Sequence, residues 1–264
     1  QIVRYLDAMT AKINKLIRAK KRQIALLQEQ KQAIINQAVT RGLDPDVELK
    51  DSGIDWLGPI PKQWQIVRMK NLFSFINRGT TPDYIEDRSY TKVVNQATFS
   101  KGYWDETQIR FTRVSPDIAR GLLKQNDVLL ASTGGGVLGK VYLFIQNGTY
   151  IADSHVTILR TQRKDVSPAY FFALLSTMYD FINAKLAKGS TNQTELQKDL
   201  LCSLVVPFPD IETQNVIVDF LDQKINIINL LIQQYQKIIE QYAEYKNSLI
   251  AAVVTGKVDV RNIA

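Results

Sequence analysis

The sequence predicts an α+β fold, in which a mixed α/β domain is flanked by two long helices that form an antiparallel coiled coil. Three observations support this prediction. The two ends of the chain repeat one another, both ends carry apolar residues at three- and four-residue steps, and the middle alternates short β-branched runs with turns. We expect a long helix over residues 1–40, a linker over 41–62, a mixed domain over 63–212, a second long helix over 213–255 and a tail over 256–264.

The terminal repeat predicts the two helices. "IVRYLDAMTAKINKLI" at 2–17 aligns without a gap with "IVDFLDQKINIINLLI" at 217–232, and "AIINQAVT" aligns in the same register with "SLIAAVVT". No Pro or Gly interrupts either copy, so each predicts one helix of roughly 57 Å. Because a lone amphipathic helix of this length cannot bury its apolar stripe, we expect the copies to pair, with Leu16 and Leu231 among the contact residues.

The middle segment predicts the mixed domain. Its apolar runs predict strands at 64–69, 90–96, 127–133, 141–146, 155–161 and 201–208. The run "SPAYFFALLSTMYDFINAKLA" predicts one continuous helix, with Ser167 as its N-cap and Pro168 in its first turn. Gly53, Gly58 and Pro59 make the preceding linker irregular.

Composition limits the classes of protein that this chain can belong to. Hydrophobic residues make up 45% of the chain, enough for a core, and the net charge of +7 suits nucleic acid without proving it. With one cysteine, Cys202, and one histidine, the sequence predicts no disulfide, no zinc cluster and a cytoplasmic protein without a metal or cofactor. No apolar run approaches the ~18 residues of a membrane span, so no membrane partner is expected.

The stretch "ASTGGGVLGKV" at 131–141 partly matches the phosphate-binding loop of nucleotide hydrolases. Gly134, Gly139 and Lys140 fit that pattern, but Val141 stands where a hydroxyl must hold magnesium. A strand-like run follows, in place of the helix that the motif requires. The stretch therefore predicts a hairpin-like element whose glycine loop can approach an anion, and a DNA phosphate fits this loop better than a nucleotide does.

Catalysis finds little support in the sequence. Asp153 and His155 lie two residues apart, which in a strand would place them on one face, but no G-x-S-x-G motif supplies a nucleophile. The sequence also lacks the Asn-Pro-Pro-Tyr-type pocket and the cofactor loop of an adenine methyltransferase. His155 is therefore expected to be a structural residue or a DNA contact.

A set of motifs in a fixed order resembles one family. The middle opens with "GIDWLGPIPKQW", continues with "NRGTTP", "NDVLLASTGGGVLGKVYLF" and "KGSTNQTELQKDLLCSLVVPFPDIETQ", and the last helix ends in "SLIAAVVTGKVDVR". Each motif is weak alone. Their order over essentially the whole chain resembles the specificity subunit of a type I restriction-modification system.

The resemblance implies a non-catalytic subunit that binds double-stranded DNA. Full subunits of that family have two target-recognition domains, and each domain reads one half of a bipartite target. Their two helical regions space these domains and dock the methyltransferase subunits, which the motor-nuclease (restriction) subunits join. The order found here resembles the second half of such a subunit. We therefore expect a further recognition domain upstream of Gln1, and we expect that two copies of this chain can associate as a homodimer.

Loops of the middle domain supply groups that can contact DNA, with cations for phosphates and polar side chains for base edges. Gly79 is expected to allow a close approach to its loop. The candidate DNA contacts are Arg78, Thr80, Thr81, Asn95, Gln96, Lys101, Tyr103, Ser132, Thr133, Lys140, His155, Lys188, Ser190, Thr191, Asn192 and Gln193.

Two other classes of function remain open. The first is a non-catalytic coiled-coil scaffold or adaptor. Gel retardation of duplex DNA that depends on sequence and weakens with salt would exclude this class. The second is a nucleotide-dependent enzyme, which an ATPase assay would test.

Overall fold

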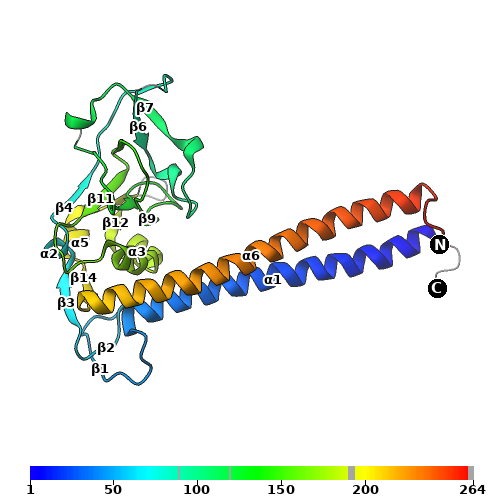
Figure 1. Cartoon of the computed structure of the whole chain (residues 1–264), viewed down its shortest axis with the longest axis horizontal. Coiled ribbons are helices and arrows are strands. Elements are labelled where there is room, and N and C mark those ends of the chain that lie inside the picture. Colours follow the sequence, from blue (N-terminus) through cyan, green and yellow to red (C-terminus); the bar gives the residue numbers. More distant parts are fainter. Residues whose placement is uncertain (89, 119, 190–193, 261–264) are drawn as a thin grey trace. The chain divides into compact units, whose positions relative to one another are not determined.

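The chain folds as two compact units. Unit 1 combines Gln1–Ile34 with Phe220–Ala264, and unit 2 is Ile35–Asp219. The long helices α1 (Ile2–Arg41) and α6 (Ile211–Val254) contribute residues to both units (Figure 1). The computed structural model describes residues 1–88, 90–118, 120–189 and 194–260.

Unit 1 is an antiparallel pair of helices, which confirms the prediction from the terminal repeat (Figure 1). Its buried cluster contains Ile13, Leu249, Val253 and Val260, with further apolar residues of both helices packed around them. Hydrogen bonds and a cation–π contact also join the helices, and in the latter the ammonium of Lys20 lies 4.3 Å from the ring centroid of Tyr235. The pair is therefore held by a narrow apolar stripe with polar contacts beside it.

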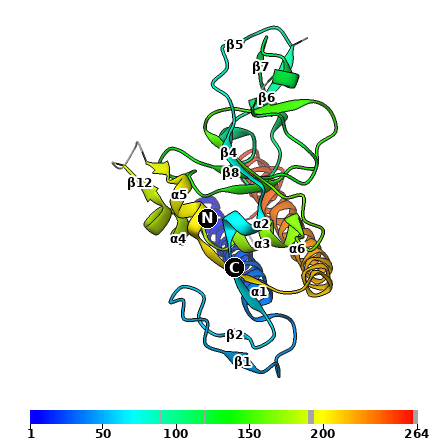
Figure 2. The same cartoon turned by 90° about the vertical axis from the view of Figure 1, so that its left-hand side faces the viewer.

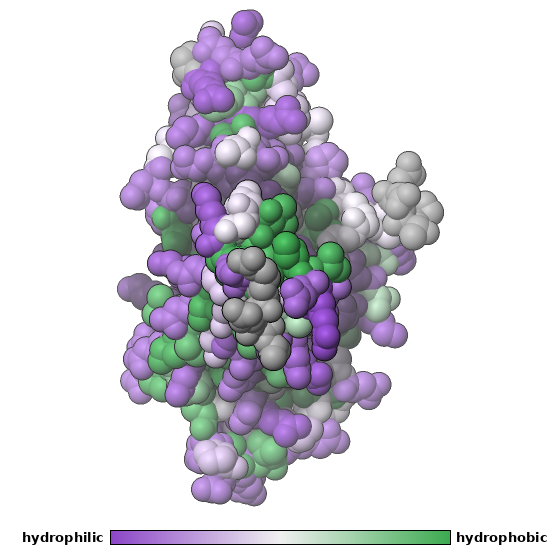
Figure 3. All heavy atoms as spheres, turned by 90° about the vertical axis from the view of Figure 1, so that its right-hand side faces the viewer, coloured by the Kyte–Doolittle hydropathy of each residue, from purple (hydrophilic) through white to green (hydrophobic). Residues whose placement is uncertain are grey.

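Apolar side chains also remain exposed on unit 1. Leu16 and Leu26 of α1 are 46% and 54% exposed, so the expectation that Leu16 packs in the contact is wrong. The physical reason is that a helix with a single partner buries only the residues that face this partner. Figure 3 looks at the end of unit 1 where α1 begins and α6 ends, and apolar residues gather there too. Val3 and Val254 are 70% and 64% exposed.

The first sheet of unit 2 has four antiparallel strands in the order β4-β11-β8-β9. These strands are β4 (Phe75–Arg78), β8 (Val128–Ala131), β9 (Val141–Leu143) and β11 (Val156–Arg160). The strands β8 and β9 form the hairpin that the glycine stretch predicted, with Leu129 opposite Tyr142. The structure therefore places the glycine loop between two strands of a sheet.

The second sheet has the order β10-β6-β7-β5 and is mixed, because β10 runs parallel to β6. Its strands are β5 (Tyr84–Ile85), β6 (Thr91–Val94), β7 (Arg110–Thr112) and β10 (Tyr150–Ala152). Only β6 was predicted from the sequence, since the others are too short to show an alternating pattern. One buried core joins the two sheets: Val94 and Tyr150 of the second sheet belong to the same cluster as Leu129 and Ile158 of the first.

Gly79 serves the packing of the chain itself. A Cβ atom on Gly79 would lie 2.0 Å from the carbonyl oxygen of Ala152, and one on Gly121 would lie 2.5 Å from the same oxygen. The amide of Thr80 donates a hydrogen bond to this oxygen at 3.0 Å. The expectation that Gly79 leaves room for an outside group is therefore wrong, because β10 of the same chain occupies the space.

Shorter elements complete the described part of unit 2. Three antiparallel pairs are β1 (Leu49–Lys50) with β2 (Ile60–Pro61), β3 (Gln65–Arg68) with β14 (Val205–Phe208), and β12 (Ala187–Lys188) with β13 (Glu195–Leu196). The short helices are α2 (Met69–Leu72), α5 (Lys198–Ser203) and the 3-10 turns η1 (Gln96–Thr98), η2 (Glu106–Gln108) and η3 (Pro116–Ile118). Helix α5 takes the beginning of the run 201–208, which was expected to be strand throughout. Figure 2 shows the β1–β2 hairpin and the strands β5 to β7 at opposite ends of unit 2.

The expected continuous helix after Ser167 is wrong beyond Ser176. The segment forms α3 (Pro168–Ser176), α4 (Tyr179–Phe181) and a π-helical turn, η4 (Ile182–Leu186). The hydroxyls of Ser176 and Thr177 each donate at 2.7 Å to a carbonyl oxygen of the preceding turn, a pattern that weakens and bends helices. Ser167 does precede the helix, but its hydroxyl makes no capping hydrogen bond.

A buried ion pair links β11 to the turn before β8. The guanidinium of Arg160 donates to both carboxylate oxygens of Asp127, at 2.7 and 2.6 Å, and to the carbonyl oxygen of Leu122 at 2.6 Å. The carboxylate also accepts the amide of Lys124 at 2.7 Å. Asp127 is fully buried, so this pair fixes the end of β11 opposite to the end at which the candidate site lies.

Candidate nucleic-acid interface

The glycine loop between β8 and β9 has a backbone that requires glycine. Gly134, Gly136 and Gly139 have φ angles of +85°, +85° and +90°, a region that other residues rarely adopt. The amide of Gly134 donates to the carbonyl oxygen of Thr194 at 3.0 Å, and Thr133 forms a β-bridge with Glu195. The loop is therefore tied to the segment around β13 rather than to the start of a helix.

Thr133 joins the glycine loop to the turn before β11. Its Oγ1 lies 2.8 Å from Nδ1 of His155 and 3.5 Å from Oε1 of Gln96. Three candidate residues from separate segments thus meet in one chain of hydrogen bonds. His155 is exposed, and its carbonyl oxygen accepts the amide of Ser132 at 2.8 Å.

His155 does not lie in a strand, contrary to expectation. It follows Asp153 in the turn between β10 and β11, and its amide donates to Oδ1 of Asp153 at 2.9 Å. Asp153 is 2% exposed, and its Oδ2 accepts the hydroxyl of Tyr84 at 2.9 Å. Burial raises the pKa of the Asp153 carboxyl, and burial together with the neighbouring Asp153 raises the pKa of Tyr84. The buried Asp153 therefore stabilises the turn from its inner side, whereas His155 is exposed to solvent.

Cations gather on the other side of Thr133. Arg78 donates to Oε1 of Glu195 at 3.4 Å and to the carbonyl oxygen of Leu196 at 3.3 Å. Lys188 of β12 stands opposite Glu195 in the register of the β12–β13 pair, and it is exposed. We call Arg78, Gln96, Thr133, His155, Lys188 and Glu195 the Thr133 cluster.

Lys198 was missed by the sequence analysis. Its Nζ donates to Oδ1 of Asn77 at 2.7 Å, and Asn77 precedes Arg78 in β4. Lys198 therefore adds a cation at β4, on the residue next to Arg78 in the chain. It follows the quoted run "STNQTELQ" directly, so the sequence did contain an indication of it.

The side chains of two other candidates make hydrogen bonds within the protein. Ser132 is fully buried, and its hydroxyl bonds to Thr157 and to the carbonyl oxygen of Leu130. Asn95 caps η1 with its oxygen and donates its amide nitrogen to the carbonyl oxygen of Gln108. The prediction for Ser132 is corrected, because its hydroxyl is buried. Asn95 is half-buried, and its role as a DNA contact stays a prediction.

The remaining candidates lie apart from the Thr133 cluster in their contacts. Among the described residues, Lys101 contacts Asp105 at 3.0 Å and lies over Tyr103, whereas Lys140 lies 4.1 Å from the ring centroid of Tyr179. The hydroxyl of Thr80 is buried without a hydrogen-bond partner in the described part, and Thr81 is exposed. Ser190, Thr191, Asn192 and Gln193 lie outside the described residues.

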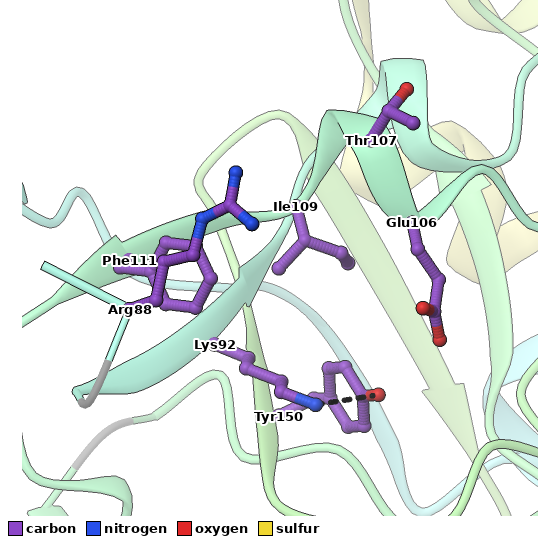
Figure 4. A pocket seen from close by; sticks show the side chains of 7 residues that line it. All are labelled: Arg88, Lys92, Glu106, Thr107, Ile109, Phe111 and Tyr150. Atoms are coloured by element: carbon purple, nitrogen blue, oxygen red, sulfur yellow. Dashed lines mark hydrogen bonds between the residues drawn. The ribbon is translucent and has the colours of Figure 1, made fainter. Parts of the chain in front are cut away.

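A second cation-bearing hollow opens on the second sheet. Its volume is about 360 Å³, and it is lined by Arg88, Lys92, Glu106, Thr107, Ile109, Phe111 and Tyr150. Figure 4 shows Lys92 and Tyr150 joined by a hydrogen bond of 3.5 Å, with Arg88 and Glu106 on opposite sides of Ile109. The sequence analysis passed over both cations, although "RSYTK" places them on either side of a tyrosine.

The described ranges contain no group of three His, Cys, Asp or Glu side chains that could hold a metal ion. Within the same ranges, no helix combines the length and the apolar character needed to cross a membrane.

Solved structures are similar to this chain in fold. A chain from a structure on complex assembly and conformational transition of the type I R-M system matches with a TM-score of 0.73 and 16% identity, over 96% of this chain and 57% of that chain. The HsdS subunit from Thermoanaerobacter tengcongensis matches with a TM-score of 0.61 and 15% identity, over 97% of this chain and 58% of that one. At these identities the likeness concerns the fold.

The family follows from the sequence itself. Residues 61–241, more than half of the chain, match the type I restriction modification DNA specificity domain, and the chain belongs to that family. It is similar to the type I restriction enzyme MjaVIII specificity subunit of Methanocaldococcus jannaschii, with 23% identity over 273 residues. This match covers 100% of the chain and 60% of the relative, so the chain spans well under the full length of that protein.

Proposed function

We propose that this chain directs a type I restriction-modification complex to one half of a bipartite DNA target, and that the Thr133 cluster faces the DNA. One observation carries the proposal: in a chain of this family, Gln96, Thr133 and His155 meet from separate segments while Arg78 and Lys188 flank them. Cations bind phosphates without regard to sequence, whereas amide, hydroxyl and imidazole groups discriminate base edges. The cluster combines both kinds of group on one surface.

We assign a separate role to each segment of the chain. Residues 63–212 form the recognition domain and 41–62 the linker, while the paired helices over 1–40 and 213–255 form a spacer with a tail over 256–264. The exposed apolar residues of unit 1, among them Leu26, support docking of protein partners there. The partners that we propose are methyltransferase subunits and, through the complex, the motor-nuclease subunit. Chemistry on DNA would then belong to those subunits, in the cytoplasm, where the DNA lies.

A second copy of the chain is a further proposed partner. The exposed Ile227 and Leu230, 56% and 60% exposed, lie close together on one side of α6 and offer surface for a twofold contact. Sedimentation of the purified chain over a range of concentrations tests this association, and a monomer at all concentrations would refute it.

The test of DNA binding uses a matched pair of lysine variants. Lys188→Ala removes an exposed cation of the Thr133 cluster. Lys164→Ala removes an exposed cation that follows the other end of β11, about 16 Å of strand away from His155. Gel retardation of duplex DNA as a function of salt should show that the first variant lowers the slope of log K against log salt by about 1. The second should leave this slope unchanged.

The outcomes separate the competing functions. A wild-type chain that retards no duplex with sequence preference would favour a protein-binding scaffold. Equal effects of the two lysine variants would leave a DNA-binding protein but place the interface outside the Thr133 cluster.

A further inference from the structure

The backbone of His155 is held by two hydrogen bonds and its imidazole by one, which leaves one ring nitrogen for an outside group. Its amide donates to the buried Asp153, its carbonyl oxygen accepts the amide of Ser132, and its Nδ1 lies 2.8 Å from Oγ1 of Thr133. The residue is nevertheless exposed. The contact with Thr133 orients the ring, and Nε2 has no partner in the described part of the chain.

The proton of the Thr133 hydroxyl decides what Nε2 can do. A hydroxyl has one proton, and Oγ1 of Thr133 donates it to Oε1 of Gln96 at 3.5 Å. The 2.8 Å contact between Oγ1 and Nδ1 of His155 is then a hydrogen bond in which Nδ1–H donates. In the neutral ring this leaves Nε2 without a proton, as an acceptor.

We infer that His155 is a specificity-determining residue that presents Nε2 as a hydrogen-bond acceptor to a base edge in the major groove. Cytosine offers the N4 amino donor on this edge, whereas guanine offers the acceptors N7 and O6. An acceptor in this position meets a partner at cytosine and is left facing other acceptors at guanine. The strand that His155 faces should therefore carry cytosine in preference to guanine at one position. This inference rests on the proposed function and adds the chemistry of one contact to it.

The opposite tautomer makes the opposite prediction. If the Thr133 hydroxyl donated to Nδ1 of His155, its hydrogen bond to Gln96 would be lost and Nε2 would carry the proton. Guanine, with N7 and O6, would then be preferred over cytosine. The base preference and the tautomer must therefore agree, and they can be measured independently.

The first experiment measures the tautomer without DNA. His155 is the only histidine in the sequence, so one pair of imidazole nitrogen resonances in the ¹⁵N-labelled full chain reports on it without ambiguity. We expect Nδ1 to be protonated and Nε2 to be bare in the neutral ring. Thr133→Ser keeps the hydroxyl and should keep this tautomer, whereas Thr133→Val removes the acceptor of Nδ1–H and should shift the population. A neutral ring protonated on Nε2 in the wild-type chain would overturn the inference.

The second experiment selects bound duplexes from a pool with a randomised segment, using the full chain. The wild-type chain should enrich cytosine over guanine at one position by about tenfold, the worth of a single good hydrogen bond. His155→Ala should lose this preference at that position alone, and Thr133→Ser should retain it. Tryptophan fluorescence checks that each variant is folded, since Trp56, Trp64 and Trp104 all lie in unit 2 with the site.

The two proposals fail in different ways. A wild-type chain that selects no sequence at all refutes DNA recognition and the role of His155 together. Selection by the wild-type chain that His155→Ala leaves unchanged refutes only the role of His155. Should His155→Ala not fold, the comparison of Thr133→Val with Thr133→Ser decides the matter, because both keep the histidine.

Discussion

Replacing Arg160 by Met should destabilise unit 2 far more than replacing Asp127 by Asn, although both changes break the same ion pair. The asymmetry comes from burial. Without Arg160, the fully buried carboxylate of Asp127 keeps the amide of Lys124 as its one donor among the described residues. The side chain of Arg160 is already 18% exposed in the intact pair. Without the carboxylate it can still donate to the carbonyl oxygen of Leu122.

The magnitudes follow from these two environments. Removing one partner of a buried pair and leaving a buried charge costs about 3–5 kcal/mol, which we expect for Arg160→Met. Asp127→Asn leaves a guanidinium that reaches solvent and keeps one hydrogen bond, so the loss should be about 1–3 kcal/mol. The double variant carries no unpaired buried charge and should be more stable than Arg160→Met alone.

Urea unfolding followed by tryptophan fluorescence measures these differences in the full chain. All three tryptophans lie in unit 2, so the signal reports the unit that contains the ion pair. Equal losses for the two single variants, or a loss below about 1 kcal/mol for Arg160→Met, would show that the pair behaves as a solvated surface pair and would refute the argument.

Two further predictions concern the helices. Val253→Asp, at a position 1% exposed, should destabilise unit 1 by about 3 kcal/mol or more, whereas Val254→Asp, at a position 64% exposed, should change its stability by no more than about 0.5 kcal/mol. Thermal unfolding followed by far-UV circular dichroism compares them, and equal shifts would contradict the packing described. Asp210 accepts the amide and the hydroxyl of Thr213, at 2.9 and 2.7 Å, and these hydrogen bonds lower the pKa of Asp210 below its ordinary value of 3.8. Asp210→Ala should therefore cost about 1 kcal/mol at neutral pH, and this difference should disappear as the pH falls through the lowered pKa; a difference that persisted in acid would count against this cap.

The candidate site could be predicted only in part. The glycine loop was recognised because glycine and polar residues between apolar runs indicate loops. The turn at His155 was not recognised, because His155 was expected to begin a strand. Ser132 and Thr133 looked equivalent in the sequence, yet the first is buried against Thr157 and the second reaches His155. Which of two neighbouring hydroxyls faces the core depends on the strand that packs beside them, and no local pattern encodes this choice.

The sequence by itself determined the two long helices, the hairpin around the glycine loop and the family to which the chain belongs. These features rest on local physics, since periodic apolar residues, an absence of helix breakers and glycines with positive φ act over a few residues. Only the tertiary structure decided where the helix after Ser167 breaks, that β10 lies in the space left by Gly79, and that Gln96, Thr133 and His155 meet. Those outcomes depend on contacts between segments that lie far apart in the chain. The shared core of the two sheets determines the register in which these segments pack.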